Sequence, residues 1–374
     1  MSTPLRRFAA VAVAIATTVV AAVSLAVLSA GRTSTENTQA SPTTAPANIN
    51  VVANSGANCL GALCVDGLPE SITISEVATY LAQLRGGLSA NNTPDDVNTC
   101  HSLAHEIGRR GAGAGSTVSS LLALDDGGCL YGYQHGVLEG WAILATNPEF
   151  RSGLPEACSV YSGPGTSSTI SEGQRAYAQG SCAHGLGHAI SLQNSGTLLD
   201  AVSYCDALSE GLRSGCAGGV FMAYSSESAS QGAYSPKQAL ELTESDVQQV
   251  CNTVGESYRS ECWAKLWLLA GRVGLDADAT AALCPQDDYR EPCGHGIGVS
   301  LMYTNSLDSA VAASKCPTSL EPYCQYGIAW ANANTWAGSG NPAAAYLSIC
   351  TQLVPVSQDS CVRNEQEALQ GAAS

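Results

Sequence analysis

The spacing of the cysteines restricts the fold of this chain more than any other feature does. The 374 residues include 16 cysteines, and those after residue 200 occur in pairs with 7–10 residues between the two members. The first cysteine of a pair ends a segment with an aspartate near its start and apolar residues at helical spacing, as in TLLDAVSYC and SLDSAVAASKC. The second begins another helical segment and is usually followed by glycine three positions later. The repeated unit is therefore helix, cysteine, short loop, cysteine, helix.

The N-terminus indicates that most of the chain leaves the cytoplasm. Arg6 and Arg7 precede an uncharged stretch, Phe8–Ala30, which is long enough to span a bilayer. The positive-inside rule keeps these arginines in the cytoplasm whether the stretch is a membrane anchor, which we favour, or a cleaved signal. We expect residues 1–30 to be this anchor or signal segment, 31–56 a flexible Thr/Ser/Pro linker, and 57–374 an extracytoplasmic domain. The protein would be a single-pass membrane protein, or secreted if the segment is cleaved.

An even number of cysteines outside the cytoplasm favours disulfides over thiolate metal ligands. A helical hairpin with a cysteine on each side of its loop would be closed by one bridge, which contributes on the order of 2–3 kcal/mol for a loop of about ten residues. The expected bridges are Cys59–Cys64, Cys100–Cys129, Cys158–Cys182, Cys205–Cys216, Cys251–Cys262, Cys284–Cys293, Cys316–Cys324 and Cys350–Cys361.

The length of the repeated unit, about 31–53 residues, is typical of α-hairpin solenoids and α/α toroids. Over roughly residues 200–361 the spacing resembles that of cysteine-rich, tetratricopeptide-like solenoids, in which a disulfide ties the two helices of every repeat. The resemblance concerns architecture only. We therefore expect an all-α fold of disulfide-stapled α-hairpin repeats that form a curved solenoid or an α/α toroid.

The acidic composition disfavours several classes of partner. The formal net charge is −16, and an acidic surface repels nucleic-acid backbones and anionic membranes. We expect no nucleic-acid partner and contact with a membrane through the N-terminal segment only. The sequence does not identify the substrate, whether a small molecule or a peptide.

All six histidines lie within six residues C-terminal to a cysteine; they are His101, His105, His135, His184, His188 and His295. Two pairs, His101/His105 and His184/His188, have the i,i+4 spacing that places both rings on one helix face. When the second-helix cysteines are aligned, His184 and His295 take one common position, and His135 and His188 take another one turn later. If these helices line the inside of a curved array, all six imidazoles converge.

Six converging imidazoles predict a metal site, because imidazole is the commonest metal-binding side chain. Copper, iron and zinc all accept it. Two pairs and two single histidines resemble, in number and spacing only, the three-plus-three ligands of a dinuclear copper centre of the type-3 kind. We therefore expect an extracytoplasmic metalloprotein and favour an oxidoreductase with a mono- or dinuclear centre. Copper is our first choice of metal, with iron or zinc as alternatives.

Two glutamates stand beside these histidines in the sequence. Glu106 follows His105, and Glu139 lies four positions after His135. Either one could bind the metal, orient an imidazole, or act as a general base on metal-bound water, so we name both as candidate catalytic residues. The alternative is that Glu106 is solvated and Glu139 neutralises a neighbour.

Other functions stay open at this point. The protein could be a non-catalytic metal-binding protein, or a protein-interaction solenoid on the cell surface whose histidines only bond to backbone carbonyls. Zinc hydrolysis requires just three histidines beside a glutamate. A bis-histidine haem b would leave four histidines without a role, and neither a C-x-x-C-H nor an H-E-x-x-H string occurs.

Overall fold

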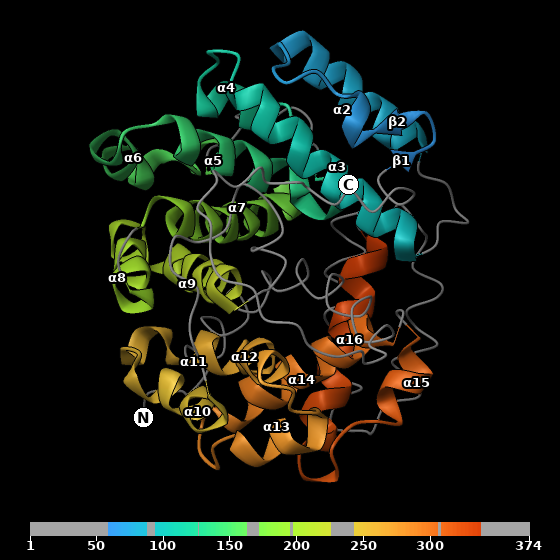
Figure 1. Ribbon diagram of the computed structural model, residues 1–374, viewed down its shortest axis with the longest axis vertical. Coiled ribbons are helices and arrows are strands. Elements are labelled where there is room, and N and C mark those ends of the chain that lie inside the picture. Colours follow the sequence, from blue (N-terminus) through green and yellow to red (C-terminus); the bar gives the residue numbers. More distant parts are fainter. Residues whose placement is uncertain are drawn as a thin grey trace, which may run out of the picture.

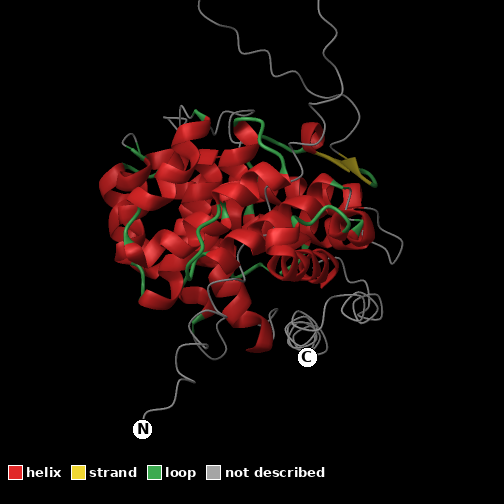
Figure 2. Ribbon diagram, turned by 90° about the horizontal axis from the view of Figure 1, so that it is seen from below, coloured by secondary structure: helices red, strands yellow, loops and turns green. Residues whose placement is uncertain are grey.

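The computed structural model describes residues 59–87, 94–125, 127–162, 172–194, 197–225, 243–305 and 308–337. Helices make up almost all of their regular structure (Figure 2). The described sheet is one antiparallel hairpin of β1 (Cys59–Leu60) and β2 (Leu63–Cys64). The mostly helical fold expected from the sequence is therefore confirmed for these residues. The expected anchor, the linker and the Cys350–Cys361 pair lie outside them.

Long, largely buried helices alternate along the chain with shorter ones, and in chain order they follow one another round the molecule from α2 to α16 (Figure 1). The long helices are α3 (Pro94–Ala112), α5 (Gly132–Leu144), α7 (Glu172–Gln193), α9 (Glu210–Ser225), α14 (Arg290–Thr304) and α16 (Glu321–Ala337), with α11 (Glu256–Ala264) and α12 (Leu266–Arg272) in sequence between α9 and α14. The shorter helices are α4 (Val118–Leu122), α6 (Asn147–Gly153), α8 (Leu198–Ser203), α10 (Glu244–Thr253), α13 (Ala277–Leu283) and α15 (Ser309–Ala313), and α2 (Ile74–Gly87) precedes the first pair of long helices. None of the described helices is both long and apolar enough to cross a bilayer.

The short helices α8, α13 and α15 start where the sequence places an aspartate near the beginning of the unit. Asp276 is the N-cap of α13 and accepts a hydrogen bond from the Ala279 N–H, and Asp308 is the N-cap of α15 and accepts from the N–H groups of Ala310 and Val311. In α8 the cap is Thr197, and Asp200 returns a bond to the Thr197 N–H in a capping box. These bonds satisfy N–H groups that have no partner inside the helix, which fixes where each short helix begins.

All seven disulfides expected between described cysteines are confirmed, and no described cysteine is free. The bond between Cys205 and Cys216 ties the 3-10 turn η7 (Tyr204–Ala207), which follows α8, to α9. The bond between Cys284 and Cys293 ties the end of α13 to α14 in the same way. The staples therefore fix the start of the long helices relative to the short helices before them.

The long helices of three pairs, α3/α5, α7/α9 and α14/α16, cross in backbone contact at glycines. In α7/α9, a Cβ on Gly187 would overlap the carbonyl oxygen of Cys216, and a Cβ on Gly219 would overlap that of His184. Each glycine thus meets the carbonyl three residues before the glycine of the other helix. Any side chain here would push the helices apart, which explains the glycines in these helix interiors despite their cost of about 1 kcal/mol each.

The same reciprocal contact recurs in the other two pairs. Gly108 meets the carbonyl of Tyr133, and Gly136 meets that of His105. The corresponding contacts in the third pair are Gly298 with Cys324 and Gly327 with His295. The three pairs are therefore equivalent at their crossings, and His105, His184 and His295 occupy the same position.

This alignment differs from the one based on cysteines, which groups His135 with His188. The reason lies at Cys129, which stands in the 3-10 turn η4 (Cys129–Tyr131) before α5 and not inside that helix. When residues are numbered from the preceding cysteine, the positions of α5 are therefore shifted relative to those of the other long helices. This shift is why the cysteine-based alignment groups His135 with His188.

Candidate metal centre

Five of the six histidines meet in one buried group, which we call the histidine cluster: His101 and His105 on α3, His135 on α5, and His184 and His188 on α7. His135 is central, with its ring centroid 5.3–5.9 Å from those of the other four. The helices α3 and α7 both pack against α5 (Figure 1). Each i,i+4 pair therefore faces His135 from its own side.

Three rings of the cluster satisfy the geometry of a metal site most closely. One nitrogen each from His101, His105 and His135 lie within 4.8 Å of one another. Two nitrogens bound to one tetrahedral ion are about 3.3 Å apart, since each metal–nitrogen bond is about 2.0–2.1 Å. A bound ion would require the most widely spaced of these nitrogens to move closer together. This histidine triad could hold a metal ion.

Hydrogen bonds to the protein leave one ring nitrogen free on two members of the triad. Nδ1 of His101 donates to the carbonyl of Cys129 at 2.9 Å, while its Nε2 is buried without a hydrogen-bond partner. Nε2 of His135 donates to the Ser181 carbonyl at 3.2 Å, while its Nδ1 is buried and unpartnered. Because the bonded nitrogen carries the proton, the free one presents a lone pair, as metal-binding histidines do.

The protonation state of these rings also suits metal binding. Burial, together with the neighbouring His105, lowers the pKa of His101 to about 3. Burial and the surrounding imidazoles hold the pKa of His135 well below its usual value. Both rings are therefore neutral at neutral pH, which is the form that coordinates a cation.

An unusual backbone turn holds the acceptor for His101. Cys129, Leu130 and Tyr131 have φ values of 51°, 54° and 58° in the left-handed region, at a cost on the order of 1–3 kcal/mol for each non-glycine residue. The turn is tied to α3 by the Cys100–Cys129 disulfide. Strained backbone concentrates at functional sites, and here it aims a carbonyl at an imidazole of the triad.

Glu139 touches two histidines of the cluster. One of its carboxylate oxygens lies 3.3 Å from Nδ1 of His105 and 3.3 Å from Nη1 of Arg109, and the other lies 3.9 Å from Nδ1 of His188. Burial alone would raise the pKa of this carboxyl, but His105, Arg109 and His188 outweigh it and lower the pKa to about 2. Glu139 is therefore a charged group that orients the imidazoles of His105 and His188 through their Nδ1 atoms.

Glu106 has a different setting. Its carboxylate forms ion pairs with Arg109 at 2.5 Å and with Arg110 at 2.6 Å on its own helix. None of its described hydrogen bonds reaches a histidine. The structure thus places Glu139 in contact with the cluster and Glu106 among arginines.

His295 lies apart from the cluster. Its described ring contacts are with Tyr326 and Trp330 of α16, at centroid distances of 5.1 and 5.4 Å. Burial and the charge of Lys265 lower the pKa of His295 to about 3. The structure therefore brings five of the six predicted metal ligands together and surrounds the sixth with aromatic rings.

The repeated crossing explains these different neighbours and reveals one residue that the sequence interpretation missed. In each pair, the side chain three residues after the second glycine touches the equivalent histidine. It is Glu139 against His105, Trp330 against His295, and Met222 against His184, where the thioether sulfur lies 3.4 Å from Nε2. Met222 could have been found from the sequence by its spacing from Gly219, had the crossing glycines been recognised.

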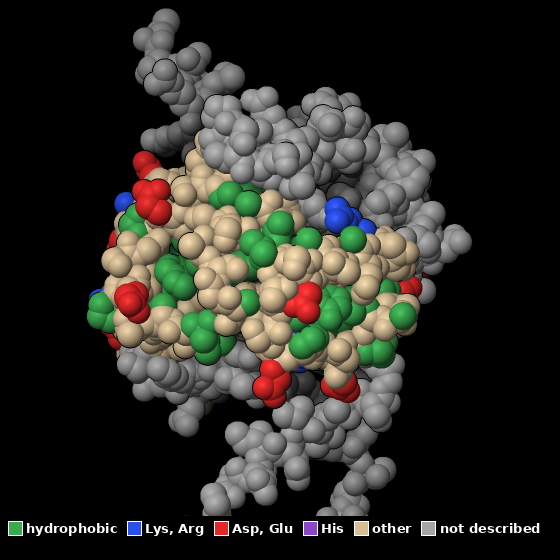
Figure 3. Space-filling view, turned by 90° about the horizontal axis from the view of Figure 1, so that it is seen from above, with side chains coloured by type: hydrophobic (Ala, Val, Ile, Leu, Met, Phe, Trp, Pro, Cys, Tyr) green, Lys and Arg blue, Asp and Glu red, His purple; other side chains and the backbone are tan. Residues whose placement is uncertain are grey.

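Access to the cluster is restricted. His135 and His184 are 0% exposed, whereas the side chains of His105 and His188 retain 14% and 17% exposure. An ion or small ligand would therefore reach the cluster on the side of His105 and His188. On the face of the molecule in Figure 3, acidic side chains stand among apolar and neutral ones.

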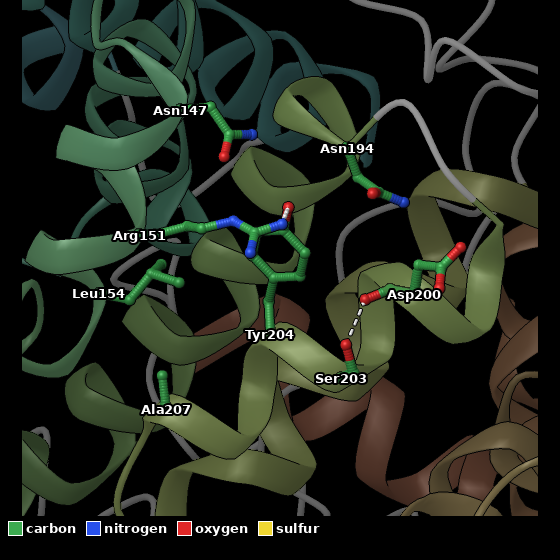
Figure 4. A pocket seen from close by; sticks show the side chains of 8 residues that line it. All are labelled: Asn147, Arg151, Leu154, Asn194, Asp200, Ser203, Tyr204 and Ala207. Atoms are coloured by element: carbon green, nitrogen blue, oxygen red, sulfur yellow. Dashed lines mark hydrogen bonds between the residues drawn. The ribbon is translucent and has the colours of Figure 1, made fainter.

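A separate hollow lies between α6 and α8 (Figure 4). The guanidinium carbon of Arg151 is 4.1 Å from the centroid of the Tyr204 ring, and the two side chains lie across one another there. Among the described residues, no histidine lines this hollow. It is therefore distinct from the histidine cluster.

No protein-family model, curated protein or solved structure matches this chain. The functional interpretation therefore depends on the geometry of the histidine cluster.

Proposed function

We propose that the protein is an extracytoplasmic metal-binding protein whose principal site is the triad of His101, His105 and His135. The observation that carries this proposal is the convergence of three imidazoles, two of which present a buried nitrogen with no other partner. Leaving such nitrogens without a partner costs about 1–3 kcal/mol each, and a bound cation would remove that cost. The seven disulfides support a location outside the reducing cytoplasm.

The donor set favours a divalent ion that accepts imidazole nitrogen. Zinc, copper and iron meet this condition. The charged Glu139 carboxylate, held against His105, would offset part of the positive charge of the ion and keep the His105 ring oriented. Glu139 does this without itself being one of the three ligands.

A redox activity with a dinuclear centre is the second candidate. It is favoured by the nearness of His184 and His188, whose rings lie 5.5 and 5.6 Å from that of His135. Two ions in paired sites are typically about 3.5–4 Å apart, a separation that the two sets of rings could support. In this form copper is our first choice of metal, and oxygen consumption by the copper-loaded protein is the decisive assay.

Equilibrium dialysis tests the proposed metal binding. The disulfide-intact protein is dialysed against Zn²⁺ and, separately, Cu²⁺, and the bound metal is counted by mass spectrometry. We expect His105→Ala, a change at a partly exposed ring, to lose the metal of the triad. The control His295→Ala should retain it. If wild-type protein retains no metal, or if His105→Ala retains as much as wild type, the proposal is wrong.

A further inference from the structure

The equivalent helix crossings place unlike side chains against the two halves of the histidine cluster. Against His105 the crossing places the charged carboxylate of Glu139, whereas against His184 it places the thioether of Met222. A carboxylate is a hard, anionic group, and a thioether is soft and neutral. The two halves of the cluster should therefore differ in the ions that they prefer.

Three donor atoms meet at His184. Its Nε2 lies 3.1 Å from Nε2 of His188 and 3.4 Å from Sδ of Met222. The first separation is close to the about 3.3 Å expected for two nitrogens bound to one tetrahedral ion, and the second is close to the about 3.6 Å expected for a nitrogen and a sulfur. Met222 and His184 are completely buried, and α7 and α9 hold them at the backbone contact of Gly187 and Gly219.

The orientation of His188 agrees with a role for its Nε2. The opposite ring nitrogen, Nδ1, faces the carboxylate of Glu139 at 3.9 Å. A carboxylate on that side favours the proton on Nδ1 and leaves the lone pair on Nε2, which lies 3.1 Å from Nε2 of His184. The Glu139 carboxylate thus contacts one histidine in each half of the cluster, His105 and His188.

The surroundings of His184 differ from those of His105. The described contacts of the His184 ring include no carboxylate, and a Cβ on Gly218 would lie 3.7 Å both from Nδ1 of this ring and from Cε of the buried Lys265. The same Cβ would lie 3.0 Å from a carboxylate oxygen of the buried Glu261, so groups of both signs stand near the ring. The preference of this half of the cluster for a soft ion therefore follows from its donor atoms.

We propose that His184, His188 and Met222 form a second, soft metal site that binds a cuprous ion, next to the triad that binds a divalent ion. Two imidazoles and a thioether are donors that select Cu⁺ over Zn²⁺. The inference rests on the proposed metal-binding function and assigns a different preference to each half of the cluster. It explains why the third equivalent crossing, with Trp330 in place of Met222, provides no such site around His295.

Anaerobic competition with the cuprous chelator bicinchoninate measures this site. The full, disulfide-intact chain is titrated with Cu⁺ kept reduced by ascorbate, and Zn²⁺ binding is measured on the same samples. Met222→Leu removes the sulfur with little change in volume. Met302→Leu is the matched control, because Met302 is also completely buried but lies on α14. His188→Ala removes a partly exposed donor.

We expect Met222→Leu and His188→Ala to weaken Cu⁺ binding by roughly 10-fold or more, about 1.4 kcal/mol, and Met302→Leu to leave it unchanged. The copper X-ray absorption spectrum should show a sulfur neighbour that Met222→Leu loses, with Zn²⁺ binding at the triad retained. If Cu⁺ binding is equal in wild type and Met222→Leu while Zn²⁺ still binds, the second site is wrong and the proposed function stands. If neither ion binds to wild type, the proposed function itself is wrong.

Discussion

The Nδ1 atom of His105 lies 3.3 Å from a carboxylate oxygen of Glu139, which follows it by 34 positions in the chain. The crossing of α3 and α5 creates this contact, since Gly136 lies directly against the carbonyl of His105. The same carboxylate oxygen accepts a hydrogen bond from Arg109. A charged group thus contacts one ring of the histidine triad and fixes its orientation.

Glu139→Gln should weaken Zn²⁺ binding by roughly 10–100-fold, the usual effect of removing a group that orients a metal ligand. The amide keeps the shape of the side chain but loses the charge that balances the ion. Isothermal titration with Zn²⁺ measures the change. Glu106→Gln is the control, because Glu106 binds Arg109 and Arg110. Equal losses in the two variants would mean that the Glu139 contact has no special role.

Gly219→Ala should destabilise the fold, because the new Cβ would overlap the carbonyl oxygen of His184. Overpacking of this kind typically costs about 1–3 kcal/mol, and the separation of α7 from α9 should also weaken Cu⁺ binding. Urea unfolding gives the free energy. The control is Gly211→Ala, on the same helix with nothing near its Cβ position, which should be neutral or slightly stabilising. Similar losses in both variants would refute the close crossing.

The sequence predicted the helical fold and the staples well, because both depend on local spacing. Short helices require caps such as Asp308, and two cysteines that flank a short loop have few other partners. The convergence of His101/His105 and His184/His188 also follows from i,i+4 spacing once their helices pack against α5. Whether the long helices form a complete solenoid or toroid stays a prediction.

What the sequence did not predict depends on which helices are neighbours. His295 shares its position in the crossing with His184, but its own partner helix supplies Tyr326 and Trp330. Met222 carries no charge and belongs to an apolar run, so nothing in its local sequence marks it as a donor. Its role becomes visible only when the glycines of α7 and α9 are placed in contact.

The stability of the metal-free protein should fall as the pH decreases below about 6.5. The pKa of His295 is lowered to about 3 by burial and by Lys265, while the unfolded chain has the ordinary value of about 6.5. The unfolded state therefore binds the proton first, so the stability present above pH 6.5 is lost progressively down to about pH 3. His295→Asn should reduce the slope near pH 5 by about 1.4 kcal/mol per pH unit. Urea unfolding with a chelator present measures both slopes, and identical slopes would contradict the burial of a neutral ring.

Loss of the Cys100–Cys129 disulfide should affect both stability and metal binding. The double change Cys100→Ala and Cys129→Ala should cost about 2–4 kcal/mol and should also weaken Zn²⁺ binding, because Cys129 supplies the acceptor for His101. The control changes Cys284 and Cys293 to alanine, on helices that carry no member of the histidine cluster. Its stability should fall while its Zn²⁺ affinity stays the same. Urea unfolding measures the stability of both variants, and zinc titration measures their Zn²⁺ affinity. An unchanged Zn²⁺ affinity in the variant without Cys100 and Cys129 would show that the turn at Cys129 does not support the metal site.

The most direct test of a metal site in the triad is anomalous diffraction at the zinc edge from crystals of the zinc-loaded protein. We predict a peak about 2.0–2.1 Å from Nε2 of His101 and Nδ1 of His135, with His105 as the third ligand. The rings of His101 and His135 should keep their hydrogen bonds to Cys129 and Ser181. A zinc peak elsewhere on the molecule, with none among the three imidazoles, would contradict the site.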